Sequence, residues 1–350
     1  MTLQEHDSII RTGAAIGAVA PGRQIAVAGK DHAAYLHGLL TNDIQGLTPG
    51  TGCYAAWLTP QGRMLTDMHV LESGPMILLD LPADTVDATL ARLDQFIFTE
   101  DVRLESLVES LRGVWVHGPR AAATIEQAVG PVLSGQPLSA WLQYQHSTCR
   151  FEGEPAPSHV EGPAPSHVEG SVSIARVDQL GVPGYCIYVA RAHEAGLLGA
   201  LDSAGAVVVL PEAIEAARIE AGYPVFGVDM TDDTIPLEAG IEDRAISMTK
   251  GCYVGQEVII RVLHRGHGRV VRKLVTLRVD GPLPLRGARL VAGDREVGSV
   301  TSAARSPRLG AMAMGYLHRD FVNAGTQVSV DTPDGVAAAI VTERLIPSAP

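Results

Sequence analysis

Strand-like and helix-like patterns of apolar residues alternate along the first third of the chain. Apolar positions at helical spacing predict helices over residues 31–40 and 83–98. Short apolar runs between turn residues predict the strands around them, at residues 25–28, 53–58, 64–71, 76–81 and 102–107. This order of elements predicts a sheet with its helices packed on one face, of the ferredoxin-like type.

The same order of elements returns in the middle of the chain, although the sequence itself does not repeat. Helices are expected over residues 119–129, 192–201 and 211–221, the last ending at Gly222. Strands are expected at residues 114–117, 171–177, 185–190 and 206–210. Residues 155–162 recur at once as residues 163–170, a Pro- and Gly-rich copy that predicts a lengthened surface loop.

Helical signals end after Arg269. Short apolar runs separated by Gly and Pro turns follow, at residues 271–279, 289–291, 296–301, 312–317, 327–330 and 336–341. They predict a small antiparallel barrel or sandwich. We therefore expect an α+β chain with two ferredoxin-like modules and a C-terminal antiparallel β-barrel. The expected boundaries are residues 1–112, residues 113–268 with the repeat-containing loop near 152–170, and residues 269–350.

Composition narrows the class of protein. The chain has 350 residues, of which 46% are hydrophobic and 19% charged, as in a soluble globular protein. No apolar run is long enough to span a bilayer, and the first ten residues, with Glu5 and Asp7, do not resemble a secretory signal. We expect a cytoplasmic protein without membrane contact. The net charge of −12 disfavours direct binding of nucleic acid.

The four cysteines, Cys53, Cys149, Cys186 and Cys252, lie far apart in the sequence. They form no CxxC pair and no Cys/His cluster with zinc spacing. We therefore expect no stably bound metal in one chain. A cluster held transiently, or shared between two chains through Cys252, stays open.

Cys252 stands between Lys250 and an apolar run that predicts a helix beginning within residues 251–254 and ending before Gly266. A helix N-terminus and a lysine both favour the thiolate, which attacks electrophiles or binds metal. A buried, inert cysteine at a helix entrance would give the same spacing. The spacing alone therefore leaves the reactivity of Cys252 open.

A basic stretch without an acidic residue follows the cysteine. It consists of Arg261, His264, Arg265, His267, Arg269, Arg272 and Lys273. Cations suit a solvated helix end and strand edge. The alternative is an anion site, for a polyglutamate tail or a phosphate backbone, which would make the protein an RNA-contacting factor.

Residues 250–257 read Lys-Gly-Cys-Tyr-Val-Gly-Gln-Glu. They resemble the signature Lys-Gly-Cys-Tyr-x-Gly-Gln-Glu of the YgfZ family, folate-binding proteins linked to iron–sulfur cluster assembly and repair and to tRNA modification. That family belongs to the glycine-cleavage T-protein, or aminomethyltransferase, superfamily. The resemblance implies a three-domain T-protein-like fold and a functional Cys252. The supporting motif residues are Lys250, Gly251, Tyr253, Gly255, Gln256 and Glu257.

Residues 218–222, Arg-Ile-Glu-Ala-Gly, resemble the superfamily's Arg-x-Glu-x-Gly motif, whose glutamate binds the pterin ring of folate. The resemblance implies that Glu220 holds the pterin through paired hydrogen bonds, with Arg218 and Phe226 as further cofactor-binding residues. Residues 236–240 follow at the superfamily's spacing. Without the resemblance, Glu220 would be an exposed glutamate near a helix C-terminus, where an anion is unfavourable.

Asp67 lies on the expected strand 64–71, on the same face as Leu65 and His69. It aligns with the aspartate that T-proteins use beside the folate. A carboxylate there could orient the folate or take a proton, and it could equally be a structural acid of the strand. Residues 41–43, Thr-Asn-Asp, also resemble the family and predict a helix-terminal turn, with Asp43 as a further candidate.

The resemblance implies a tetrahydrofolate-binding protein that supports iron–sulfur cluster assembly or repair, and thereby tRNA modification. In this hypothesis Glu220, Asp67 and a reactive Cys252 face one folate cavity between the three modules, and the partners are folate and iron–sulfur client or assembly proteins. The alternative is a folate-dependent aminomethyltransferase of the glycine cleavage system. Asp67 and residues 236–240 favour the alternative, whereas the cysteine motif does not, because that reaction needs no enzyme thiol. The sequence leaves open whether any reaction is catalysed.

Overall fold

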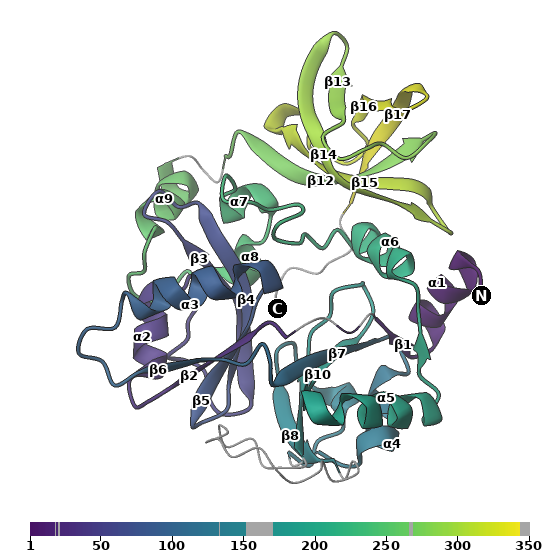
Figure 1. The fold of residues 1–350 in the computed structure, drawn as a ribbon. Coiled ribbons are helices and arrows are strands. Elements are labelled where there is room, and N and C mark those ends of the chain that lie inside the picture. Colours follow the sequence, from purple (N-terminus) through teal and green to yellow (C-terminus); the bar gives the residue numbers. More distant parts are fainter. Residues whose placement is uncertain (18, 20–21, 133, 152–170, 266–268, 344–350) are drawn as a thin grey trace.

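The computed structural model describes residues 1–17, 19, 22–132, 134–151, 171–265 and 269–343. Figure 1 shows two α+β units beside each other and a β-barrel above them. The duplicated segment 155–170 lies outside the described residues. Within those residues, none of the helices combines the length and the apolar character that crossing a membrane requires.

The first unit is a five-stranded antiparallel sheet in the order β3-β4-β5-β2-β6. Its strands are β2 (Gln24–Ala28), β3 (Thr51–Leu58), β4 (Met64–Glu72), β5 (Met76–Asp80) and β6 (Arg103–Ser106), and its helices are α2 (His32–Leu39) and α3 (Val86–Asp94). Leu36 and Val86 join both helices to one core on the outer face of the sheet. The order β6-β2-β5-β4 is that of a split βαβ sheet, to which β3 adds an edge strand.

The second unit is a six-stranded sheet in the order β11-β1-β7-β10-β9-β8. Its strands are β1 (Ala15–Ile16), β7 (Leu111–His117), β8 (His146–Arg150), β9 (Ser171–Arg176), β10 (Gly184–Ala190) and β11 (Val207–Val208). The helices α4 (Ala121–Val129) and α5 (Glu194–Ser203) pack on one face through Ile125 and Leu197.

One expected boundary differs from the structure. Strand β1 lies within residues 1–112, yet it pairs with β7 and β11 of the second sheet. Ala15 and Ile16 are almost completely buried there. Two apolar residues carry no period, so the local pattern does not indicate which sheet they join.

The barrel follows as expected. Its six strands close in the order β12-β15-β14-β13-β16-β17, and each neighbouring pair is antiparallel. The strands are β12 (Arg272–Asp280), β13 (Arg289–Ala292), β14 (Arg295–Ser306), β15 (Gly310–His318), β16 (Gln327–Thr332) and β17 (Gly335–Thr342). Val and Ala side chains that alternate along the strands fill the interior.

The remaining helices join these three parts. They are α1 (Leu3–Thr12), α6 (Pro211–Ala221), α7 (Pro236–Ala239), α8 (Glu242–Ala245) and α9 (Gln256–Ile260), which continues as one π-helical turn (Arg261–Arg265). Helix α6 packs against both α1 and β14. It ends as predicted at Gly222, whose φ of 74° is left-handed.

The inner faces of the two sheets pack against each other. Tyr54 and Leu78 of the first sheet share one core with Trp115 and Tyr188 of the second. The helices of each unit therefore cover the outer faces, and the loop that follows α6 closes over the contact between the sheets.

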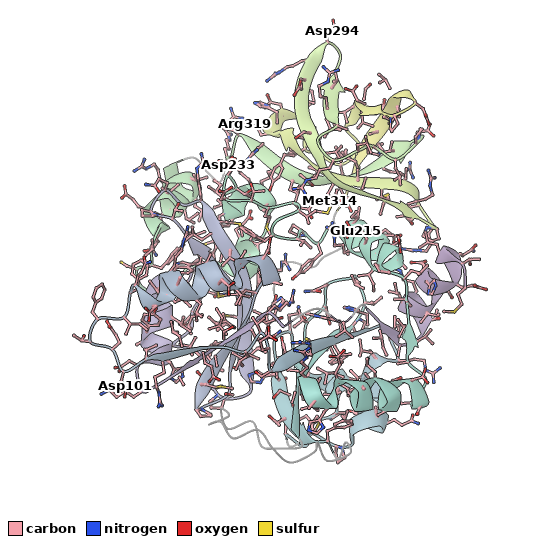
Figure 2. All side chains as sticks on the ribbon, in the orientation of Figure 1. Asp101, Glu215, Asp233, Asp294, Met314 and Arg319 are labelled. Carbon is pink, nitrogen blue, oxygen red and sulfur yellow. The ribbon has the colours of Figure 1, made fainter. Side chains whose placement is uncertain are left out.

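Asp229 fastens this loop to the barrel. It accepts hydrogen bonds from Arg218 at 2.8 Å, Thr301 at 2.6 Å and Ser302 at 2.7 Å. The carboxylate is 1% exposed. In Figure 2, Glu215 of α6 and Met314 of the barrel mark the same junction.

We expect Asp229→Ala to lower the free energy of unfolding by about 3–5 kcal/mol, because the buried Arg218 guanidinium loses its closest buried counterion. Urea denaturation followed by circular dichroism measures the change. Asp232→Ala, an exposed acid of the same loop, should stay within about 0.5 kcal/mol of the parent. Equal effects of the two substitutions would contradict this role of Asp229.

Candidate functional site

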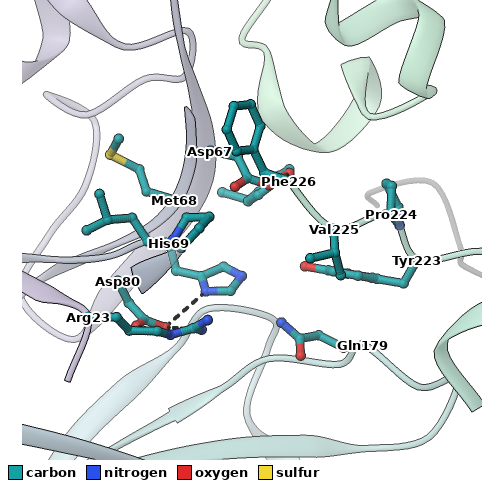
Figure 3. Close-up of a pocket in the computed structure, with 13 residues that line it drawn as sticks. Arg23, Asp67, Met68, His69, Asp80, Gln179, Tyr223, Pro224, Val225 and Phe226 are labelled. Atoms are coloured by element: carbon teal, nitrogen blue, oxygen red, sulfur yellow. Dashed lines mark hydrogen bonds and ion pairs between the residues drawn. The ribbon is translucent and has the colours of Figure 1, made fainter. Parts of the chain in front are cut away.

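A cavity lies between the first sheet and the loop that follows α6, and Figure 3 shows its lining. The space in it that a water-sized sphere can reach is about 70 Å³. Its lining consists of Arg23, Tyr54, Asp67, Met68, His69, Asp80, Leu81, Pro82, Gln179, Tyr223, Pro224, Val225 and Phe226. The structure thus brings together two of the expected site residues, Asp67 and Phe226.

Asp67 reaches the cavity because β4 turns alternate side chains toward the inner face of the sheet. It lies opposite Ala56 of β3, and the Tyr54 hydroxyl donates to its Oδ2 at 2.6 Å. The residue is 8% exposed, and burial raises the pKa of its carboxyl, although the Tyr54 hydrogen bond and His69 act in the opposite direction. Asp67 therefore takes up a proton more readily than a free aspartate does.

Asp80 is the second carboxylate of the cavity, and it is fully engaged. Arg23 donates to both of its oxygens, from Nε at 2.9 Å and from Nη2 at 3.0 Å. Gln24 and Tyr188 donate as well. Burial is the largest influence and would raise the pKa of Asp80, but Arg23 and His69 together hold it well below the usual range.

The two carboxylates therefore have different capacities. Asp80 stays ionised, and it forms the floor of the cavity together with Arg23. The Arg23 guanidinium also lies 5.6 Å from the centre of the Trp115 ring. Asp67 can exchange a proton. Carboxylates whose environments push their pKa values apart are typical of acid–base sites.

Several lining residues escaped the sequence analysis. Tyr54 and Tyr223 belong to no motif. Arg23, which directly precedes β2, becomes the partner of Asp80 because β2 pairs with β5. The strand alternation that placed His69 beside Asp67 could also have placed Tyr54 inward, once the register of β3 and β4 was known.

Glu220, expected to hold the pterin, does not line this cavity. It is 2% exposed on α6, where Arg11 of α1 donates to its Oε2 at 2.8 Å and Arg308 of the barrel pairs with the same oxygen. The packing of α6 against both α1 and the barrel supplies these arginines. The alternative of an exposed glutamate therefore differs from the structure, whereas the pterin-binding role of Glu220 stays a prediction.

Arg218, the other residue expected from this motif, is likewise engaged elsewhere. Its guanidinium donates to Asp229 at 2.8 Å and to the Tyr223 carbonyl at 2.9 Å, and it also pairs with Glu215. Arg218 thus fixes the loop that carries Tyr223 and Phe226, and it does not itself line the cavity.

The residues of the cysteine motif shape a loop. Lys250 donates from Nζ to the carbonyls of Leu40 at 2.6 Å and Asn42 at 3.1 Å, at the end of α2. Tyr253 is buried under the Lys250 ammonium. Gly255 has a left-handed φ of 86°, and a Cβ there would approach the Thr59 carbonyl to 2.5 Å.

The expected setting of Cys252 is wrong in two respects. Helix α9 begins only at Gln256, so its N-terminus does not start at the cysteine. The ammonium of Lys250, whose pKa burial lowers to about 8, is directed to backbone carbonyls. Cys252 is exposed and does not line the cavity with Asp67.

The basic stretch is not free of acids in the folded chain. Arg261 pairs with Glu257 at 2.6 Å, Arg272 with Glu238 at 3.2 Å, and Lys273 lies 3.8 Å from Glu242. The side chains of residues 264–268 lie outside the described residues. Three of its cations are therefore neutralised locally, which favours the solvated-surface interpretation.

The described residues contain no group of three or more His, Cys, Asp or Glu side chains placed to hold a metal ion.

Comparisons with known proteins identify the fold and the family. A model of the GCVT N-terminal domain matches residues 1–149, and a model of the glycine cleavage T-protein C-terminal barrel domain matches residues 272–346. The crystal structure of glycine cleavage system aminomethyltransferase T from Bartonella henselae superposes with a TM-score of 0.81 at 24% identity, covering 99% of this chain and 90% of that one.

Relatives of established name agree with this. The aminomethyltransferase of Bacillus subtilis is 26% identical over 336 residues, 94% of this chain and 86% of its own. That of Rubrobacter xylanophilus is 29% identical over 315 residues, 89% of this chain and 78% of its own. Since models of two domains of one family match residues 1–149 and 272–346, the chain belongs to the glycine cleavage T-protein superfamily.

Proposed function

We propose that this protein binds tetrahydrofolate in the cavity lined by Asp67 and acts as a folate-dependent aminomethyltransferase. The observation that carries the proposal is a buried carboxylate with a raised pKa, held by Tyr54, in a cavity walled by aromatic rings. The aminomethyltransferases of similar sequence support the same reaction class.

The lining fits a flat, hydrogen-bonding ring. Phe226 and Tyr223 offer apolar ring faces, on which a heterocycle can stack. Asp67, His69 and Gln179 offer hydrogen-bonding groups at the rim of the same space. Bound tetrahydrofolate would supply a nitrogen that accepts the one-carbon unit.

The chain's own residues would prepare that transfer. Asp67 would orient the ligand and hold or accept a proton, and the Tyr54 hydroxyl at 2.6 Å keeps its carboxylate aimed at the cavity. Phe226 and Tyr223 would exclude water. The Arg23–Asp80 ion pair would form the floor of the site, and neither of its two side chains would change its charge during the reaction.

The test uses the intact protein in two steps. Isothermal titration with tetrahydrofolate measures binding, and an assay with an aminomethylated lipoyl carrier measures one-carbon transfer to tetrahydrofolate. Binding together with transfer supports the proposal. Binding of tetrahydrofolate without one-carbon transfer would refute the enzymatic part of the proposal. The absence of binding would refute the whole proposal.

A second candidate is the YgfZ-type role in iron–sulfur cluster assembly or repair. One observation favours it. Contacts of Lys250, Tyr253 and Gly255 stabilise the loop that carries the cysteine motif, whereas Cys252 is exposed at the surface of this loop. An exposed thiol is accessible to a client protein, whereas it is not positioned for chemistry on a ligand in the Asp67 cavity.

We expect Cys252→Ser to change tetrahydrofolate binding and one-carbon transfer by less than about 2-fold, because an exposed substitution away from the cavity perturbs little. Met248→Ser, exposed nearby, is the matched control. In cells that lack the endogenous protein, failure of Cys252→Ser alone to restore iron–sulfur enzymes would establish the second role. A loss of transfer in vitro would contradict the placement of Cys252 outside the site.

A further inference from the structure

Arg244 of α8 stacks on two tyrosines that line the proposed folate cavity, although Arg244 is not itself one of the lining residues. Its guanidinium carbon is 5.2 Å from the centre of the Tyr54 ring and 4.8 Å from the centre of the Tyr223 ring. Both tyrosines line the cavity. Neither a motif nor a periodic pattern singles out Arg244 in the sequence.

The backbone of Arg244 is held firmly against the first sheet. The side-chain amide of Asn42 donates to the carbonyls of Tyr54 at 2.8 Å and Arg244 at 3.0 Å. The Thr41 hydroxyl lies 2.6 Å from the next carbonyl, that of Ala245. Residues 41–42 therefore fasten α8 to β3, and they present the guanidinium in a defined place.

The charge of Arg244 is unbalanced, in contrast to its buried neighbours. Arg23 pairs with Asp80, and Arg218 pairs with Asp229. Within the part of the chain that the structure describes, no acidic side chain forms an ion pair with Arg244, and the groups that act on it are the hydroxyls of Tyr54, Tyr144 and Tyr223. A partly buried cation is normally matched by an anion.

The stacking also determines where a partner can bind. Tyr54 and Tyr223 cover the guanidinium faces, and the Tyr223 hydroxyl also accepts a hydrogen bond from it, so a ligand can meet only the remaining N–H groups at the edge. A planar carboxylate matches such an edge with two parallel hydrogen bonds. Asp67, which accepts a hydrogen bond from the Tyr54 hydroxyl, suits hydrogen-bond donors instead.

We propose that Arg244 binds a carboxylate of the ligand that occupies the cavity. The inference rests on the proposed function and extends it to the anionic end of the ligand. The carboxylate belongs either to the glutamyl tail of the folate or to the one-carbon donor, and the two sources can be separated experimentally.

Isothermal titration with three ligands tests the proposal. Tetrahydrofolate carries both the ring and the carboxylates, 6-methyltetrahydropterin carries only the ring, and 4-aminobenzoyl-glutamate carries only the carboxylates. We expect Arg244→Met to raise the Kd of the two carboxylate ligands by about 10- to 100-fold and to leave that of the tetrahydropterin unchanged. Arg244→Lys should lie between, since it keeps the charge and loses the planar fork.

Arg295→Met, an exposed arginine of the barrel, is the matched control and should change none of the three constants. Circular dichroism and the thermal midpoint establish that each variant is folded. If Arg244→Met does not fold, Arg244→Lys tests the proposal instead, by whether the Kd rises for the two carboxylate ligands and not for the tetrahydropterin. Arg244→Met can also leave the Kd of all three ligands unchanged and raise the KM for a one-carbon donor that carries a carboxylate. That result would assign the bound carboxylate to the donor.

Two results would overturn the proposal. One is an equal loss for all three ligands, which would make Arg244 only a wall of the cavity. The other is no change in any binding constant or in KM. If the parent protein binds 4-aminobenzoyl-glutamate but not tetrahydrofolate, the proposed function fails and Arg244→Met still decides this inference. Binding of none of the ligands would refute both.

Discussion

Replacing Asp67 with asparagine is expected to lower the rate of one-carbon transfer by about 10²–10⁴-fold, because the amide keeps the shape of the side chain and cannot accept a proton. The measurement is the transfer rate at saturating tetrahydrofolate. Burial raises the pKa of Asp67, so the parent's rate should fall at low pH, with a midpoint above the usual range of an aspartate. This limb of the pH profile should be absent in Asp67→Asn.

Glu220→Gln makes the same acid-to-amide change on α6. Because Arg11 and Arg308 already hold that carboxylate, its loss is expected to lower thermal stability and to leave the transfer rate within about 3-fold of the parent. The opposite ranking, with Glu220→Gln losing folate binding and Asp67→Asn keeping its rate, would return the pterin to Glu220.

Arg23→Met should lower the free energy of unfolding by about 3–5 kcal/mol at neutral pH, because it leaves the buried Asp80 carboxylate without its bidentate partner. Contact with the Trp115 ring is lost as well. Urea denaturation measures the change, and loss of less than about 1 kcal/mol would show that the pair adds little.

The pH dependence of stability separates an electrostatic cause from a packing defect. In the parent, the folded-state pKa of Asp80 lies below its unfolded value, so this contribution is present above the unfolded pKa and is lost as pH falls through the folded one. In Arg23→Met, burial acts without the arginine and raises the folded pKa. The deficit of the variant should therefore shrink as pH falls and Asp80 becomes protonated.

A double substitution, Arg23→Met with Asp80→Asn, completes the cycle. Removing both charges is expected to recover much of the lost stability, since neither a buried charge nor an unmatched guanidinium remains. A double variant that is no more stable than Arg23→Met would indicate that packing against Trp115, and not the ion pair, accounts for the loss.

Local patterns in the sequence predicted much of the secondary structure. The structure confirms the helix over residues 211–221 with its stop at Gly222, and it places α4 and the barrel strands near their expected positions. A period of 3.6 or 2 reports which face of an element is buried, and this is a property of a few neighbouring residues. The same alternation placed Asp67 and His69 on one face of a strand, but it also placed Leu65 there, and Leu65 packs in the core on the helix-covered face of the sheet.

The T-protein resemblance also came from short local strings, and the comparisons establish the superfamily. They do not distinguish its YgfZ branch. The motif around Cys252 shows the limit of such strings, because its lysine and glycine prove to be parts of a tightly built loop in the fold. A motif records which residues occur together and not which contact each one makes.

Tertiary structure alone decided the partners. Glu220 meets Arg11 and Arg308, which are remote in sequence and both pair with its Oε2, whereas its buried Oε1 has no hydrogen-bond partner among the described residues. Arg244 meets Tyr54 and Tyr223, and β1 joins the second sheet. Periodicity determines whether a side chain is buried, whereas the group it is buried against depends on how distant elements pack, and local sequence does not contain that information.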